Sequence, residues 1–211
     1  MLKKLGIVIG NDTKAATLFE NAIPNFLAIK YKSPSDYINI CLKSCKSYLD
    51  ESKSNNLNGK IFEYIVSTLC VRESILPLYL SAKVAFVPNV TYDLMLYSQE
   101  RGPICLSLKT SLRERYKQAD LEAIALKYVH RKSLSYLITL NHSEAKKAKE
   151  KILTGDIIGL DQIIVASDPE FNVLIDDLLK FKFVRPPTVE VVTSNQIVTA
   201  ENVKRLVEKN A

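Results

Sequence analysis

The chain has 211 residues, of which 47% are hydrophobic and 25% are charged. This composition is typical of a globular protein with one sizeable core and excludes a disordered or fibrous chain. The 29 lysines and arginines exceed the 23 aspartates and glutamates, and the formal net charge of +6 favours a polyanionic partner without requiring one.

The cysteines and the lack of long apolar runs indicate which kinds of site and which cellular compartment to expect. The four cysteines form no C-x-x-C pair and only two histidines accompany them, which argues against a zinc site and fits a reducing cytoplasm. The apolar run near the N-terminus is too short for a signal peptide. No run approaches the roughly 20 apolar residues of a membrane span, so no membrane partner is expected.

The first 58 residues are expected to form a helical subregion packed on a catalytic core. Residues 5–9 fit either a strand or a segment leading into a helix. Helical periodicity covers residues 13–31, with a break at Pro24, and a second helix is expected from a cap at Ser35 or Asp36 to about Leu49. Residues 52–60 are polar and are expected to form a loop.

Residues 59–166 are expected to form the catalytic core of a single domain, and residues 167–211 a C-terminal extension. Strands are expected at residues 83–88, 91–98, 104–109, 134–140 and 163–166, and core helices at 60–72, 112–130 and 143–153. The extension is expected to hold a helix at 169–181, a strand at 188–193 and a helix at 200–210. This order predicts an α/β (α+β) fold with a mixed central sheet flanked by helices.

The segment from Ile104 to Lys109 is expected to be a strand that ends in a lysine. Its sequence ICLSLK alternates, so Ser107 and Lys109 lie on one face. The preceding strand contains Asp93, an ionisable residue in an otherwise apolar run. The turn from Gln99 to Pro103 would pair the two strands as an antiparallel hairpin.

A helix is expected after this strand, capped by Thr110 or Ser111. Its first turn would carry Arg113, Glu114 and Arg115, and Glu122 follows two turns later. The inward stripe is expected to comprise Leu121, Ile124, Ala125 and Tyr128. Glu122 would then lie at the rim of the packed face, with Gln118 one turn earlier.

These residue types suit hydrolysis of a phosphodiester. Carboxylates such as those of Asp93 and Glu122 are oxygen ligands for a hard divalent cation. A lysine beside them can hold a nucleophilic water or steady developing negative charge. Ser107 has no His/Asp pair beside it in the sequence pattern, so a serine hydrolase is not indicated.

The pattern of Asp93, then Ser107-Leu108-Lys109, then Glu122 resembles the PD-(D/E)XK nuclease superfamily. It is similar to the variant in which the second carboxylate is relocated to the next helix, with residues 110–121 as the spacer. That variant belongs to type II restriction endonucleases of the CCGG-related branch, in the EcoRII, PspGI and NgoMIV groups. Here Pro88 stands five positions before Asp93 instead of directly preceding it.

The resemblance implies a core of order αβββαβ and assigns roles to individual residues. Asp93 and Glu122 would bind Mg²⁺, and Lys109 would act on the water with Ser107 in support. Glu63, on the helix before the Asp93 strand, would support the metal. The triplet 113–115 is similar to the recognition element of enzymes that read CC-N-GG or CC-W-GG.

Each assignment has a simpler structural alternative. Glu63 also fits a solvated helix glutamate, and Lys109 fits a lysine that extends from a strand end to solvent. Arg113 and Arg115 also fit an exposed arginine pair, although cations oppose the helix dipole at that end. In the functional interpretation, the guanidinium groups of Arg113 and Arg115 would bind O6 and N7 of guanine, and Glu114 would accept a hydrogen bond from cytosine N4. Gln118 would contact a phosphate.

The resemblance therefore implies a type II restriction endonuclease that uses Mg²⁺ to hydrolyse double-stranded DNA at a short palindromic site containing CC/GG. A two-fold symmetric target calls for a homodimer. Two alternatives stay open: another PD-(D/E)XK nuclease of DNA repair or junction resolution, and a non-catalytic DNA-binding module.

Overall fold

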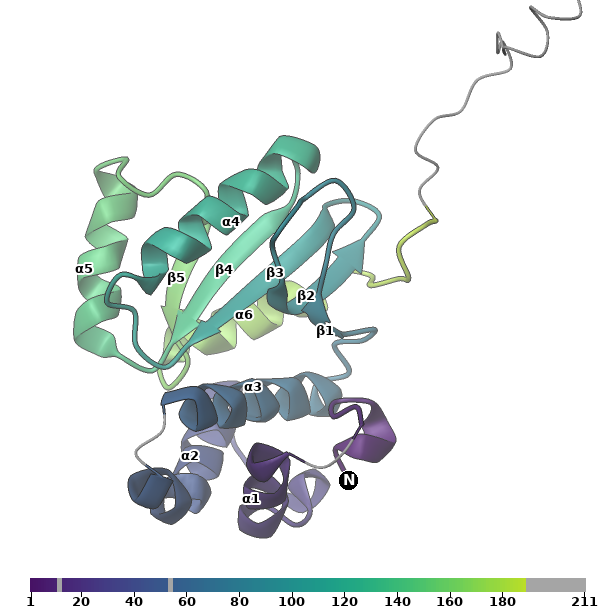
Figure 1. The fold of residues 1–211 in the computed structure, drawn as a ribbon, viewed down its shortest axis with the longest axis vertical. Coiled ribbons are helices and arrows are strands. Elements are labelled where there is room, and N and C mark those ends of the chain that lie inside the picture. The colour runs from purple at the N-terminus through teal and green to yellow at the C-terminus, as the bar shows by residue number, and fades with distance from the viewer. Residues whose placement is uncertain (11–12, 53–54, 189–211) are drawn as a thin grey trace, which may run out of the picture.

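The computed structural model describes residues 1–10, 13–52 and 55–188, and it contains a five-stranded sheet with helices on both faces (Figure 1). The strands are β1 (Tyr79–Ala82), β2 (Tyr92–Ser98), β3 (Gly102–Lys109), β4 (Leu134–Thr139) and β5 (Gln162–Val165). The α-helices are α1 (Lys14–Ala22), α2 (Pro34–Ser52), α3 (Asn55–Arg72), α4 (Arg115–Val129), α5 (His142–Leu153) and α6 (Pro169–Leu179). Two 3-10 turns occupy Lys3–Leu5 and Phe26–Ala28.

The sheet is mixed, as the sequence predicts. Its strand order is β1-β2-β3-β4-β5, with β1, β2 and β3 antiparallel and β3, β4 and β5 parallel. Lys109 pairs with Thr139, and Thr139 pairs with Val165. The carboxyl ends of the three parallel strands therefore meet at one edge, where open α/β sheets place their ligands.

Alternation along the strands separates two apolar layers. Leu94, Leu106 and Ile138 lie in the core cluster shared with α1, α2, α3 and α6. Leu137 and Val165 lie in a second cluster with residues of α4 and α5. Because successive strand side chains point to opposite faces, a buried strand must be apolar on both, which explains why β2, β3 and β4 are mostly apolar.

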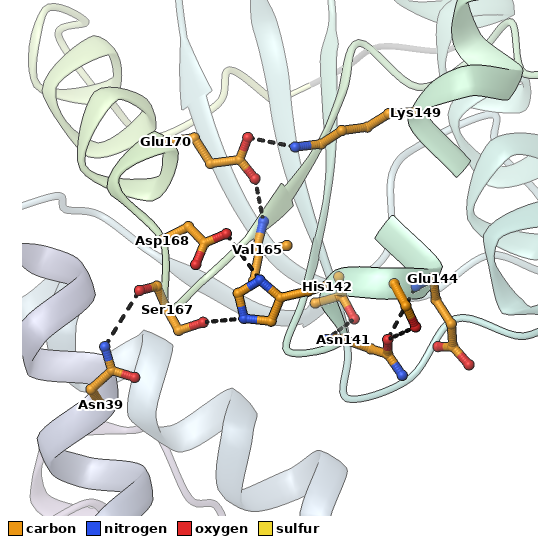
Figure 2. Close-up of polar contacts among 11 residues, drawn as sticks. Asn39, Asn141, His142, Glu144, Lys149, Val165, Ser167, Asp168 and Glu170 are labelled. Carbon is orange, nitrogen blue, oxygen red and sulfur yellow. Dashed lines mark hydrogen bonds and ion pairs between the residues drawn. The ribbon is translucent and has the colours of Figure 1, made fainter. Parts of the chain in front are cut away.

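The carboxyl ends of β4 and β5 are joined by polar contacts to three helices (Figure 2). His142, at the start of α5, lies 3.1 Å from Asp168 Oδ2 through Nδ1 and 3.3 Å from Ser167 Oγ through Nε2. Asn39 of α2 donates to the carbonyl of Ser167 at 3.4 Å. These bonds tie the N-terminal helices to the same sheet edge.

The structure corrects several predicted boundaries. Residues 83–88 are a loop, not a strand, and the edge strand is β1; Phe86 in that loop has φ 65° and is 56% exposed. The predicted loop at 52–60 is wrong for its described residues, because α2 extends to Ser52 and α3 begins at Asn55 and buries Leu57. Residues 3–5 form a 3-10 turn followed by irregular chain. The expected strand at 188–193, except Thr188, and the helix at 200–210 lie outside the described residues.

The predictions for the first helix and for the inward face of α3 are confirmed. Helix α1 begins after Thr13, whose Oγ1 accepts the N–H of Ala16, and ends before Pro24. Along α3, Ile61, Phe62, Ile65 and Leu69 are buried as expected. The four cysteines are buried free thiols. None of the helices within the described residues is long and apolar enough to span a bilayer.

Candidate active site

Asp93 and Lys109 meet on neighbouring strands of the sheet. The β2–β3 register pairs Leu94 with Leu106, so the next step along the hairpin places Asp93 opposite Ser107. Asp93 Oδ2 accepts hydrogen bonds from Lys109 Nζ and from the backbone N–H of Leu108, both at 2.8 Å. The two side chains are 20% and 16% exposed, which leaves them reachable from solvent at the sheet edge.

Glu63 approaches this pair from α3. Its carboxylate accepts a hydrogen bond from Lys60 Nζ at 2.6 Å and is only 17% exposed. Burial raises the pKa of the Glu63 carboxyl; the Lys60 ammonium opposes this, and the charge of Asp93 adds to it. The charge of Lys109 lowers the pKa of Glu63, so the predicted supporting carboxylate interacts with both members of the Asp93–Lys109 pair.

Glu122 approaches from α4, on the other face of the sheet. Glu122 and Ser107 line the same narrow cavity together with Tyr92, and the Tyr92 hydroxyl donates to the backbone carbonyl of Glu122 at 3.1 Å. Glu122 and Ser107 therefore lie side by side, as the resemblance implies for a relocated carboxylate. Gln118 Nε2 donates to Glu122 Oε1 at 2.8 Å, so these two residues share a helix face as predicted.

Electrostatics link Glu122 to the same pair. Burial raises the pKa of the Glu122 carboxyl, hydrogen bonding from Gln118 and the charge of Lys109 oppose this, and the charge of Asp93 adds to it. Geometry thus joins the predicted site residues as two pairs, Asp93 with Lys109 by a hydrogen bond and Ser107 with Glu122 in one cavity. Glu63 and Glu122 interact with the Asp93–Lys109 pair through their charges.

The carboxylates suit a hard divalent cation by chemistry. They supply oxygen donors from three elements, and their mutual repulsion would be relieved by a cation between them. Over the described residues, no group of three His, Cys, Asp or Glu side chains is placed to hold a metal. Lys60 and Lys109 instead bind the oxygens of Glu63 and Asp93.

The predicted recognition residues lie earlier than expected relative to α4. The helix begins at Arg115, so Arg113 and Glu114 form the turn before it, and neither Thr110 nor Ser111 is its cap. Leu112 is buried and its N–H bonds to Glu144 Oε2 at 2.5 Å, which anchors the segment before the turn.

The predicted recognition turn, residues 113–115, is exposed. Arg113 has φ 37°, in the left-handed region that side chains rarely adopt. Glu114 pairs with Lys117 at 2.5 Å. The two guanidinium groups therefore lie on the surface, where a polyanion can reach them.

The inward face of α4 differs from the predicted stripe. Leu121 and Tyr128 are 66% and 83% exposed, so their predicted burial is wrong. The buried residues are Ala119, Asp120, Ala123 and Leu126. The reason is close packing, since a Cβ at Gly159 would lie 2.5 Å from the carbonyl oxygen of Asp120. Gly159 therefore packs directly against the backbone of α4, and a residue larger than glycine does not fit at that position.

Asp120 and Lys60 were not found from the sequence. The Asp120 carboxylate is 7% exposed and accepts N–H bonds from Ile158 at 3.2 Å, Gly159 at 2.6 Å and Leu160 at 3.1 Å. Its partners are about forty residues away in the chain, so no local signal predicts them. For Lys60, the spacing of three residues to Glu63 was the available signal.

No protein-family model and no curated protein matches the sequence. Solved structures do show a likeness. A chain from the complex of restriction endonuclease PspGI with substrate DNA is 14% identical with a TM-score of 0.62, covering 80% of this chain and 93% of that chain. The type IIP restriction endonuclease Kpn2I is 13% identical with a TM-score of 0.51, covering 78% and 72%. The protein therefore has the restriction-endonuclease-like α/β fold, a mixed five-stranded sheet flanked by helices.

Proposed function

We propose that the protein is a type II restriction endonuclease that hydrolyses double-stranded DNA with Mg²⁺ at a short palindromic site containing CC/GG. The observation that carries the proposal is the bond between Asp93 and Lys109 at the sheet edge, flanked by Glu122 and Glu63. The fold shared with PspGI, whose structure is a complex with substrate DNA, supports it. In this proposal the whole chain acts as one nuclease domain with residues 59–166 as its core.

The proposed metal ligands are Asp93 and Glu122, with Glu63 in support. Magnesium at this place supplies Lewis-acid stabilisation of the charge that develops on the phosphoryl oxygens. The ammonium of Lys109, held over the sheet edge by Asp93, would orient the attacking water and help it lose its proton. Ser107 would act locally, leaving room for the Glu122 carboxylate that lines the same cavity.

The proposed base contacts come from the recognition turn. Two guanidinium forks and one carboxylate match the donor and acceptor pattern of adjacent G·C pairs in the major groove. The turn is exposed and precedes the helix that carries Glu122, so base reading and cleavage would lie close together. Gln118 would contact a phosphate next to the metal ligand that it bonds.

A palindromic target also predicts a homodimer, since a two-fold symmetric site is matched by a two-fold symmetric protein. Each protomer would then cut one strand. Sedimentation of the protein bound to a duplex with one site measures this, and two protomers per duplex are expected.

Digestion of phage DNA with Mg²⁺, followed by sequencing of the fragment ends, tests the function. Discrete fragments with one shared terminal sequence are the expected result, and Lys109→Ala should yield none. Nicking that follows DNA shape would favour a repair or junction nuclease. Binding without any cleavage would favour a non-catalytic DNA-binding module.

A further inference from the structure

Lys60 is a second lysine at the candidate active site. Its Nζ lies 2.6 Å from Glu63 Oε2, one helical turn along α3, and the charge of Asp93 also acts on it. The Lys60 side chain is 41% exposed, whereas the Glu63 carboxylate is 17% exposed. The ammonium is thus the more exposed partner of a mostly buried carboxylate.

Other lysine pairs with the same spacing differ in their surroundings. Lys117 with Glu114 and Lys180 with Asp177 are also three residues apart, at 2.5 and 2.6 Å. In both pairs the two side chains are at least 47% exposed, and solvent screens such pairs to little net effect. The Lys60–Glu63 pair instead has a mostly buried carboxylate, and the charge of Asp93 acts on both of its members. Its charge is therefore less screened by solvent.

We propose that Lys60 is a positioning residue that competes with the divalent cation for Glu63. This inference rests on the proposed function. The carboxylates of Glu63 and Asp93 carry two negative charges against the two positive charges of Lys60 and Lys109. Removing the Lys60 charge leaves one net negative charge to attract a cation and frees the Glu63 oxygen.

The displaced ammonium has space to move into. Lys60 also lines a cavity of about 630 Å³ between the N-terminal segment, α3 and β1, together with Thr13, Tyr64 and Lys83. A cation that takes Glu63 therefore need not disturb the packing of α3. The freed Lys60 can bind a DNA phosphate, which would keep it away from Glu63.

This exchange couples the two ligands. A phosphate that holds Lys60 removes the competitor at Glu63, so DNA should tighten cation binding, and by linkage the cation should tighten DNA binding by the same factor. The Lys60→Met variant lacks the competitor and should lose that coupling while it binds the cation well.

Titration of the full-length protein with Mg²⁺ in a calorimeter, without DNA, tests the inference. Lys60→Met should bind Mg²⁺ about tenfold more tightly than the parent. A cation at Glu63 would lie within a few ångströms of the Lys60 ammonium, and removing that repulsion should strengthen binding by about this factor. Lys60→Arg keeps the charge and should bind like the parent. Lys180→Met, at a matched distance from Asp177, should also bind like the parent.

Equal Mg²⁺ affinity of the parent and Lys60→Met would overturn the inference, as would no Mg²⁺ binding by either. In a Glu63→Gln background, Lys60→Met should change the Mg²⁺ affinity much less, because the carboxylate for which Lys60 and Mg²⁺ compete is absent. Cleavage of phage DNA is scored separately. If Lys60→Met binds Mg²⁺ more tightly but the parent does not cleave DNA, the proposed function alone is wrong. If the parent cleaves DNA but Lys60→Met has the same Mg²⁺ affinity as the parent, the inference alone is wrong.

Discussion

Lys109 Nζ and Asp93 Oδ2 lie 2.8 Å apart across the β2–β3 hairpin, and the backbone N–H of Leu108 bonds to the same oxygen. The acid is therefore held by both the backbone and the side chain of the strand that presents the lysine. This geometry fixes the spacing of the two groups through the hydrogen-bonded register of the strands, and only Glu63 and Glu122 depend on how helices pack against the sheet.

The hairpin pair leads to the first prediction. Asp93→Ala, Lys109→Ala and Glu122→Gln should each lower the cleavage rate by several orders of magnitude, because the metal and its water supply several kcal/mol of transition-state stabilisation. DNA binding should stay measurable in all three, by gel shift in the presence of Ca²⁺. If Glu122→Gln cleaved at the parent rate, the relocated-carboxylate assignment would be wrong.

The second prediction concerns pH and stability. Burial raises the pKa of the Glu122 carboxyl above its ordinary value of 4.5. Between the pKa of the unfolded state and that of the folded state, the folded protein therefore binds more protons than the unfolded one. Stability is therefore lost as pH rises through that window and stays lower at neutral pH. In EDTA, Glu122→Gln should raise Tm at pH 7 and leave it unchanged at a pH below 4.

Magnesium supplies the control for this prediction. At a concentration of about 100 Kd, Mg²⁺ should stabilise the parent by about 2.7 kcal/mol and Glu122→Gln by much less. Scanning calorimetry with and without Mg²⁺ measures both effects. A lower Tm for Glu122→Gln at pH 7 in EDTA would contradict the account of this carboxyl.

The third prediction concerns base reading by the recognition turn. Arg113→Ala and Arg115→Ala should each reduce the preference for the cognate site roughly ten- to hundredfold, since a bidentate arginine–guanine pair discriminates by about 1–3 kcal/mol. Binding to cognate and scrambled duplexes is compared at one salt concentration. An equal loss on both duplexes would make these arginines phosphate contacts and remove the support for a CC/GG site.

The fourth prediction concerns Asp120. Asp120→Ala leaves the N–H groups of Ile158, Gly159 and Leu160 buried without their acceptor and should destabilise the protein by about 3 kcal/mol. Gly159→Ala should also destabilise it, because the new Cβ would lie 2.5 Å from a carbonyl oxygen. Urea unfolding measures both.

Asp176, an exposed aspartate on α6, is the matched control for this change. Asp176→Ala should alter the free energy of unfolding by less than about 0.5 kcal/mol. Equal stability of Asp120→Ala and Asp176→Ala would show that the three N–H bonds do not hold α4 in place.

The sequence was sufficient for the parts of the site with local signals. Alternation along β2 and β3 and the short turn between them predict the hairpin that joins Asp93 to Lys109. It was not sufficient for the orientation of α4, because Leu121 and Tyr128 follow helical spacing but are exposed. The helix orientation is set instead by the contact of Asp120 with Gly159, which is a tertiary contact.

The start of α4 shows the same limit. Thr110 and Ser111 have the side chains of helix caps, yet the burial of Leu112 and its bond to Glu144 delay the helix to Arg115. The edge strand was misplaced for a related reason. Residues 83–88 have strand-like apolar residues, but the pairing with β2 uses Tyr79–Ala82.

The position of Arg113 and Glu114 ahead of α4 has an evolutionary consequence. Their exposed side chains lie outside the hydrogen-bond ladder of the helix and outside the buried contacts of Leu112 and Asp120. Substitutions at these two positions therefore leave the helix and the placement of Glu122 largely untouched. Under the proposed function, a lineage with this architecture could therefore change its sequence preference by point mutation at these two positions without altering the residues of the candidate active site.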